Sequence, residues 1–147
     1  MADNLELIRK LFEHKLQILE KSLLEARIAQ RNAPSAMESH SDTTRSEMEK
    51  MVTALEIEIR NIKEKIESIP ASLTPPNGSV QLWQEVQINN TGTPMTVIFV
   101  PDGMGGDTIG QTKLISETTR LGRAMLGKRV GESCDIDGRK VEVLQLK

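Results

Sequence analysis

The clearest structural signal in this chain is the segment Met48-Glu-Lys-Met-Val-Thr-Ala-Leu-Glu-Ile-Glu-Ile-Arg-Asn-Ile-Lys-Glu-Lys-Ile-Glu-Ser-Ile-Pro70. Its apolar residues recur at alternating steps of four and three: Met48, Val52, Leu55, Ile59, Ile62, Ile66 and Ile69. Such steps keep apolar side chains on one seam of a helix and pair that seam with a second helix. Pro70 cannot continue a helix, so we expect the helix to end there.

A second seam lies upstream and ends before a turn. Its apolar residues, which step by the same rule, are Phe12, Leu16, Leu19, Leu23 and Ala26. The first helix is therefore expected from about Leu5 to about Gln30, which is on the order of 40 Å of helix. Pro34 interrupts the pattern, and two seams split by a turn predict an antiparallel coiled-coil hairpin over residues 1–70. A parallel homodimeric coiled coil is the alternative.

The start of the second helix has two candidates. Ser35-Ala-Met-Glu38 has the form of a capping box, in which a serine caps the helix and a glutamate reaches back to it. Thr44-Arg-Ser-Glu47 has the same form and would start the helix nine residues later. We expect the earlier start.

The tip of the hairpin is polar. The second seam, extended backwards, meets Arg45, Ser41 and Glu38. Glu38 and Asp42 are four residues apart, so their carboxylates share one helix face. A functional pair of tip acids is one interpretation. The other is structural, because acids near a helix N-terminus are favoured by the helix dipole. Two carboxylates are too few ligands for a stable metal site of their own.

A different kind of sequence follows Pro70. Residues 71–79 form a linker rich in turn residues, and residues 80–147 predict a small antiparallel sheet with one short helix. Strands are expected at Val80–Ile88, Met95–Val100, Glu132–Ile136 and Lys140–Leu146, with a helix at Thr119–Leu126 and a loop at Pro101–Gly106. The predicted fold class is α+β, with the helical hairpin preceding the sheet domain.

Composition excludes several classes of function. The 19 basic and 21 acidic side chains give a net charge of −2, so bulk charge does not attract nucleic acid. A single cysteine, Cys134, fits a reducing cytoplasm. No apolar run approaches the roughly 20 residues of a membrane span. The sequence also lacks a convincing nucleophile–base pair, since His14 and His40 both lie in the hairpin. We expect a cytoplasmic protein without membrane contact that is not an enzyme in itself.

The segment Leu121-Gly-Arg-Ala-Met-Leu-Gly-Lys128, preceded by Ile115-Ser116, resembles the C-terminal signature of the bacterial Gre family of transcript cleavage factors. The order of hairpin and sheet domain is similar over nearly the whole chain. The resemblance implies an FK506-binding-protein-like fold for the second domain and RNA polymerase as the partner of a monomeric factor. It also implies docking through the sheet domain, which we assign to Ser116, Thr118, Arg120, Arg123 and Lys128, with Arg129 in the same basic cluster. The alternative for the basic residues is a solvated edge of the helix and strand.

The resemblance further implies a role for the tip. Gre-like hairpins enter the polymerase secondary channel, where tip acids help to hold Mg²⁺ of the polymerase active site. The polymerase then cleaves the 3′ end of backtracked nascent RNA by two-metal hydrolysis. Glu38 and Asp42, with Ser41 beside them, are the corresponding residues here, and the factor has no cofactor of its own. The tip departs from the family pattern, because Ser41 stands where the second acid is usual.

Three functions follow as alternatives. The first is a factor that promotes RNA cleavage through its tip carboxylates. The second is a channel binder that inhibits or modulates the polymerase without cleavage. The third, from another class, is a coiled-coil chaperone or prolyl isomerase, although Trp83 and Phe99 alone supply few aromatic groups for an isomerase pocket.

Overall fold

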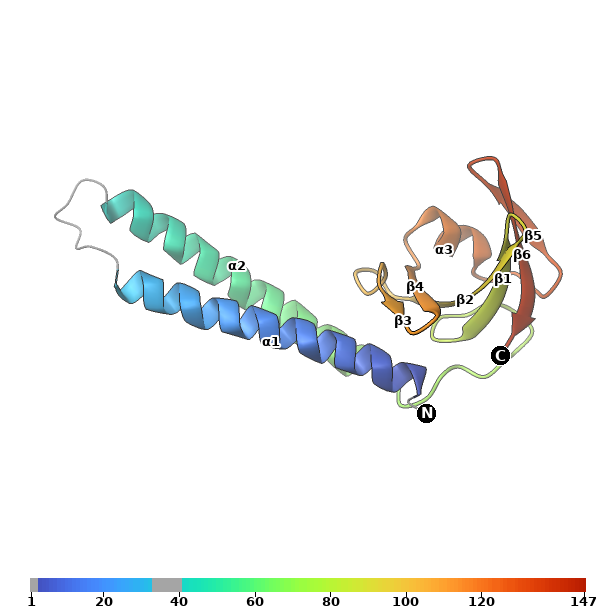
Figure 1. The fold of residues 1–147 in the computed structure, drawn as a ribbon, viewed down its shortest axis with the longest axis horizontal. Helices are drawn as coiled ribbons and strands as arrows, with labels where there is room; N and C mark the ends of the chain where they lie inside the picture. The colour runs from blue at the N-terminus through green and yellow to red at the C-terminus, as the bar shows by residue number, and fades with distance from the viewer. Residues whose placement is uncertain (1–2, 33–40) are drawn as a thin grey trace. The chain divides into compact units, whose positions relative to one another are not determined.

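A computed structural model describes residues 3–32 and 41–147 of the chain, and the side chains of all of these except residues 41–45. The chain divides into two compact units, Met1–Ile69 and Pro70–Lys147. The first unit is helical and the second contains a sheet with one short helix (Figure 1). The expected α+β fold class is confirmed.

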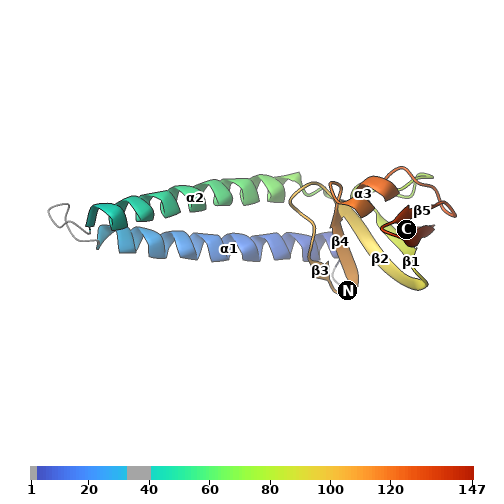
Figure 2. The same cartoon turned by 90° about the horizontal axis from the view of Figure 1, so that it is seen from above.

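Two long helices form the first unit. Helix α1 spans Asn4–Arg31 and helix α2 spans Ser41–Ser68, and they lie side by side in both Figure 1 and Figure 2. The Asp3 carboxylate caps α1 by accepting a hydrogen bond from the Leu5 N–H at 3.4 Å. The antiparallel hairpin within one chain is confirmed, and α2 ends two residues before Pro70.

The predicted seams hold the hairpin together. Leu23 and Ala26 of α1 and Ile59 of α2 are buried, as seam positions should be. Beside the seam, Arg27 Nη2 lies 3.1 Å from Glu56 Oε1, with both side chains about half exposed. An exposed ion pair of this kind contributes little stability, so the buried seam carries most of the attraction between the helices.

The two proposed starts of α2 have different outcomes. Thr44 lies inside α2, so a start at the later capping box is wrong. The helix is already formed at Ser41, ahead of that box. Ser35 and Glu38, which form the preferred box, lie outside the described residues.

The second unit is a six-stranded sheet with strand order β3-β4-β2-β1-β6-β5. The strands are β1 Glu85–Asn90, β2 Thr93–Val100, β3 Thr108–Ile109, β4 Thr112–Ser116, β5 Ser133–Ile136 and β6 Arg139–Leu146. Helix α3, Arg120–Met125, lies between β4 and β5 in the chain. The sequence predicted β1, β2, β5, β6 and α3, although with slightly different bounds.

The sheet differs from the expected one because it is mixed. Strand β2 pairs in parallel with β4, whereas the other four strand pairs of the sheet are antiparallel. After β2 the chain passes through a loop and forms β3. It then reverses direction into β4, which is antiparallel to β3 and lies beside β2, running in the same direction as β2. Residues 107–114 show no clear alternation of apolar and polar residues from which β3 and β4 could be predicted.

The first strand also begins later than expected. Residues 80–84 are not part of β1, because Trp83 takes a positive φ of 61° and turns the chain. A bulky residue rarely adopts this conformation, and surrounding contacts must stabilise it. The Trp83 N–H donates to the Phe99 carbonyl at 2.9 Å, and its own carbonyl accepts from the Thr74 N–H at 2.7 Å. Gln84, fully buried, accepts the Gln81 N–H at 3.1 Å and so closes the same turn.

The main hydrophobic cluster of the sheet unit lies on one face of the sheet, and Ile98 and Leu114 on the opposite face are buried as well. Val86, Val97 and Phe99 are fully buried in the main cluster, and Met125 of α3 packs against them. The burial of alternate residues along β1 and β6 follows the period of two that a strand imposes. This packing fixes α3 over the sheet and positions the segment between β4 and α3.

Candidate functional site

The predicted tip site lies at the start of α2. Ser41 and Asp42 form the first turn of this helix, and Glu38 lies outside the described residues. A first-turn position for Asp42 agrees with both interpretations, because the helix dipole favours an acid there whatever its function. The roles of Glu38, Ser41 and Asp42 therefore stay predictions.

The predicted docking residues, in contrast, gather around the segment from β4 to α3. Ser116 ends β4, and its hydroxyl lies 2.8 Å from the hydroxyl of Thr118. Thr118 also donates to the Asp102 carboxylate at 3.0 Å, and its N–H donates to Ser116 Oγ at 3.2 Å. These hydrogen bonds tie the loop after β2 to the turn after β4. The two hydroxyls are thus held in fixed positions by their neighbours.

Thr119 connects the same turn to α3. Its hydroxyl donates to the Ser116 carbonyl at 2.8 Å and accepts the Gly122 N–H at 3.0 Å, which makes it the N-cap of the helix. Beyond α3, the Gly127 N–H donates to the Val80 carbonyl at 2.9 Å. The signature segment is therefore anchored at both of its ends.

Two glycines allow the backbone to pack closely at this turn. A Cβ atom on Gly122 would lie 2.2 Å from the Ser116 carbonyl oxygen, and one on Gly105 would lie 2.4 Å from the Ser116 nitrogen. Real Cβ atoms do not approach a backbone so closely. Gly122, a residue of the recognised signature, thus has a structural role, since it lets α3 approach the end of β4.

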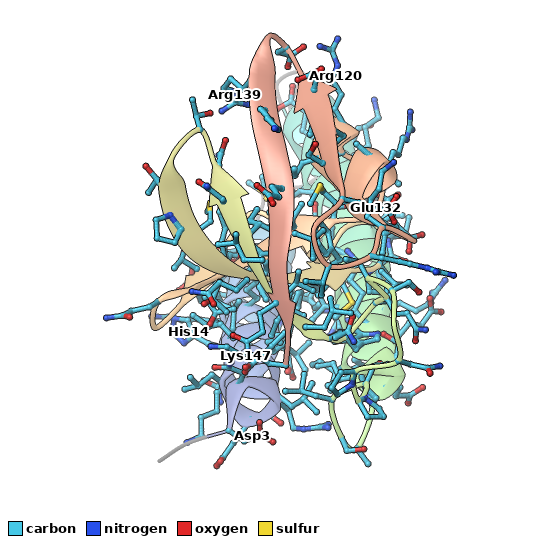
Figure 3. The ribbon with its side chains drawn as sticks, turned by 90° about the vertical axis from the view of Figure 1, so that its right-hand side faces the viewer. Asp3, His14, Arg120, Glu132, Arg139 and Lys147 are labelled. Carbon is cyan, nitrogen blue, oxygen red and sulfur yellow. The ribbon has the colours of Figure 1, made fainter. Side chains whose placement is uncertain are left out.

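The three basic residues have different surroundings. Arg120 lies near the end of the β5–β6 hairpin (Figure 3). It forms an ion pair with Asp137 of the turn between these two strands. Arg123 is exposed on α3 and Lys128 is half-buried just after it, and neither forms an ion pair with another residue of the described part of the chain. Arg123 and Lys128 are therefore better placed than Arg120 to meet an acidic partner.

An apolar hollow adjoins the predicted docking residues. It has a volume of about 360 Å³ and is lined by Gly105, Gly106, Lys113, Leu114, Ile115, Ser116, Thr119 and Leu121. Its wall contains one cation and no aromatic side chain. Trp83 and Phe99 are both buried elsewhere in the unit, so the hollow does not resemble an aromatic-lined isomerase pocket.

The single cysteine lies close to a buried methionine. Cys134 Sγ is 3.3 Å from Met125 Sδ, and burial raises the pKa of the Cys134 thiol above its ordinary value. The nearby Lys128 partly opposes this rise in pKa, and Asp135 adds to it. The thiolate is the nucleophilic form of cysteine, so a raised pKa makes Cys134 a poor nucleophile at neutral pH.

We expect Cys134 to react more slowly with a thiol reagent in the folded protein than in the same chain unfolded by denaturant. The reaction rate of the folded protein should increase with pH and reach half its maximum above the ordinary cysteine pKa. A spectrophotometric thiol assay at a series of pH values measures this. A midpoint below the ordinary value would contradict the burial of the thiol.

No group of three His, Cys, Asp or Glu side chains that could hold a metal lies together among the described residues. Within the same residues, no helix is long and apolar enough to cross a membrane.

Asp102, Thr119 and Asp137 complete the arrangement but were absent from the predicted site. Thr119 could have been found, because a threonine directly before a helical segment is a common N-cap. Asp102 contacts Thr118, which is 16 residues away in the sequence, and Asp137 contacts Arg120, which is 17 residues away. Contacts at that separation depend on the tertiary fold and leave no local signal in the sequence.

No model of a known protein family matches the chain, and no curated protein matches it in sequence. Solved structures with a similar arrangement do exist. The crystal structure of GreA factor homolog 1 (Gfh1) of Thermus thermophilus is 20% identical with a TM-score of 0.41, over 95% of this chain and 94% of that one. Gfh1 of Thermus aquaticus is 19% identical with a TM-score of 0.40, over 93% and 92% of the two chains. A structure of the transcription factor Gfh1 is 18% identical with a TM-score of 0.40, over 94% of this chain and 92% of that one.

Proposed function

We propose that this protein is a Gre-like transcription factor that binds RNA polymerase and acts through the polymerase active site. The observation that carries the proposal is the combination of a long helical hairpin with a sheet domain that bears the Gre-like segment Leu121–Lys128. In the structure this segment builds α3 and the turn after it, next to the hydroxyls of Ser116 and Thr118.

The sheet domain supplies the proposed docking surface. Arg123 and Lys128 offer positive charge, the ordered hydroxyls of Ser116 and Thr118 offer hydrogen bonds, and the hollow beside them can receive an apolar side chain. A surface with an apolar centre and a polar rim is typical of protein–protein interfaces. It supports binding to an acidic partner surface such as the rim of the polymerase channel.

The hairpin is long enough to extend from a docked sheet domain into a channel of the polymerase. Each helix has 28 residues, which corresponds to about 42 Å at 1.5 Å per residue. In this proposal the hairpin enters the secondary channel and brings Glu38 and Asp42 to the active site. There the carboxylates help to hold a second Mg²⁺, which lowers the pKa of the attacking water and stabilises the developing charge on the phosphate. The polymerase provides the remaining ligands, so the factor has no cofactor of its own.

The test is to add the protein to a stalled, backtracked elongation complex with Mg²⁺ and to follow the labelled RNA. Shortening of the nascent RNA from its 3′ end supports the proposal. Slower nucleotide addition without shortening supports the second candidate, a channel binder that inhibits or modulates. The specific observation that favours this candidate is Ser41, which stands where the family usually has its second acid. If neither effect occurs and the protein does not bind polymerase, the proposal is wrong.

The docking surface makes its own prediction. The double substitution Arg123→Ala/Lys128→Ala should weaken polymerase binding by about tenfold or more, because each lost charge contact at an interface costs on the order of 1 kcal/mol. Arg139→Ala/Lys140→Ala removes the same charge from exposed residues of the β5–β6 hairpin and serves as the control. Affinity measured at two salt concentrations compares the pairs. Equal losses in both variants would contradict the assigned surface.

A further inference from the structure

The two flanks of the hairpin differ in their polar side chains, although large apolar side chains such as Leu24 and Ile57 are also exposed outside the flank described below. On one flank, Arg27 and Glu56 form an ion pair across the seam. The other, which we call the apolar flank, is hollowed in two places. One hollow is lined by Lys15, Ile18, Leu19, Glu58, Asn61, Ile62 and Lys65, and the second by Ser22, Glu25, Ala26, Ala29, Met48, Met51 and Leu55. The two hollows lie on the same flank, because Ser22 and Glu25 follow Lys15 and Ile18 by one heptad.

Large apolar side chains are exposed on this flank. Ile18 is 52% exposed and Met51 is 51% exposed, whereas Ser22 and Ala29 present only small side chains. A surface with protruding side chains beside small ones can interlock with a partner helix. Its charges then decide which partner fits.

The charges on the apolar flank are arranged in two bands. Lys15 and Lys65 form a basic band, and Glu25 and Glu58 form an acidic band closer to the α1–α2 connection. A second copy that runs in the opposite direction would place its acidic band over the basic band of the first. A copy in the same direction would instead oppose like charges, which is unfavourable.

The positions of these charges satisfy a two-fold axis. The point midway between Lys15 and Glu25 on α1 is residue 20, and the point midway between Glu58 and Lys65 on α2 falls between residues 61 and 62. Arg27 of α1 contacts Glu56 of α2, and their numbers add up to 83. In an antiparallel hairpin, other pairs of residues with about the same sum therefore lie at the same height along the two helices. The two midpoints are therefore level to within about 2 Å along the helices, as a single axis requires. The same axis sets Ile18 against Ser22 of the second copy, a large side chain against a small one.

We propose that the apolar flank is a self-association surface on which a second copy of this chain packs antiparallel, with Lys15 against Glu25 and Lys65 against Glu58 of the other copy. The flank extends about 20 Å from Lys15 to Ala29, which is small for a specific interface, so the dimer should be weak and depend on protein concentration. Such a dimer covers one flank of the hairpin. Any effect on entry into the polymerase channel rests on the proposed function, but the self-association does not.

Charge reversal in two separate variants tests the pairing. One variant carries Lys15→Glu/Lys65→Glu and the other carries Glu25→Lys/Glu58→Lys. A homodimer of either variant would contain four pairs of like charges, so each variant alone should be monomeric, whereas an equimolar mixture should form a heterodimer. Sedimentation velocity over a range of concentrations measures the masses, and circular dichroism confirms that each variant keeps its helices.

The wild type should approach twice the chain mass at high concentration and dissociate on dilution or in high salt. Ile18→Ser, which removes the apolar centre without changing charge, should weaken the dimer at every salt concentration. A wild type that stays monomeric throughout would overturn the proposal. So would variants that associate separately as well as the wild type does, or a mixture of folded variants that fails to associate.

Discussion

Replacing Gly122 with alanine should destabilise the sheet domain by about 1–3 kcal/mol or more, the cost of forcing extra atoms into a packed site. The new Cβ would lie 2.2 Å from the Ser116 carbonyl oxygen and 3.0 Å from the Glu117 Cα, and both are backbone atoms that cannot rotate away. Helix α3 would have to move from the end of β4, which would break the hydrogen bonds of Thr119. In an unobstructed helix the same change would stabilise by about 1 kcal/mol, so the sign of the effect is diagnostic.

Denaturant unfolding followed by the fluorescence of Trp83, the only tryptophan, measures this effect in the sheet domain. Arg123→Ala is the matched control, because it changes the exposed neighbour of Gly122 in the same helix and should alter stability by no more than about 0.5 kcal/mol. In Gly105→Ala the new Cβ would lie 2.4 Å from the Ser116 nitrogen, so this substitution should destabilise the domain similarly. A Gly122→Ala protein as stable as the wild type would contradict the close approach of α3 to β4.

The largest functional effect is expected from the tip. Glu38→Ala/Asp42→Ala should reduce cleavage of backtracked RNA by about 10- to 100-fold, the usual loss when residues that support a metal site are removed. Binding to polymerase should persist, since the proposed docking surface lies in the sheet domain. The labelled-RNA assay gives the cleavage rate, and a competition experiment gives the affinity.

The control for this variant is Glu64→Ala/Glu67→Ala, which removes two exposed acids from α2 outside the tip. It changes the net charge equally and should leave cleavage intact. If the tip variant cleaves at the wild-type rate, Glu38 and Asp42 are not the functional acids. If both variants lose cleavage equally, the effect comes from total charge and not from the tip.

The hairpin was predictable because its signal is local and repeated. Steps of four and three from Met48 to Ile69 place one side chain per turn on the same seam, and the structure buries such residues as Leu23 and Ile59. The sheet was only partly predictable. Strands β3 and β4 are short and lack alternation, and the parallel pair of β2 with β4 depends on a chain reversal that no local pattern encodes.

The candidate site shows the same division. The resemblance led to Ser116, Thr118 and Arg120 as docking residues, but their partners required the fold. Arg120 turned out to be paired with Asp137 across the sheet domain. The turn of residues 80–84, where Trp83 adopts a positive φ, was also missed, because a hydrogen bond to the Phe99 carbonyl and one from the Thr74 N–H stabilise a backbone that tryptophan does not favour by itself.

In the proposed function, the tip of the hairpin reaches the metal of the polymerase active site. Replacing the active-site Mg²⁺ with Fe²⁺ generates hydroxyl radicals that cut only nearby polypeptide, and end-labelled factor then reports where its chain was cut. We expect cuts around residues 38–42 that disappear when the channel is blocked. Cuts confined to the sheet domain, or a bound factor without cuts in the hairpin, would contradict it.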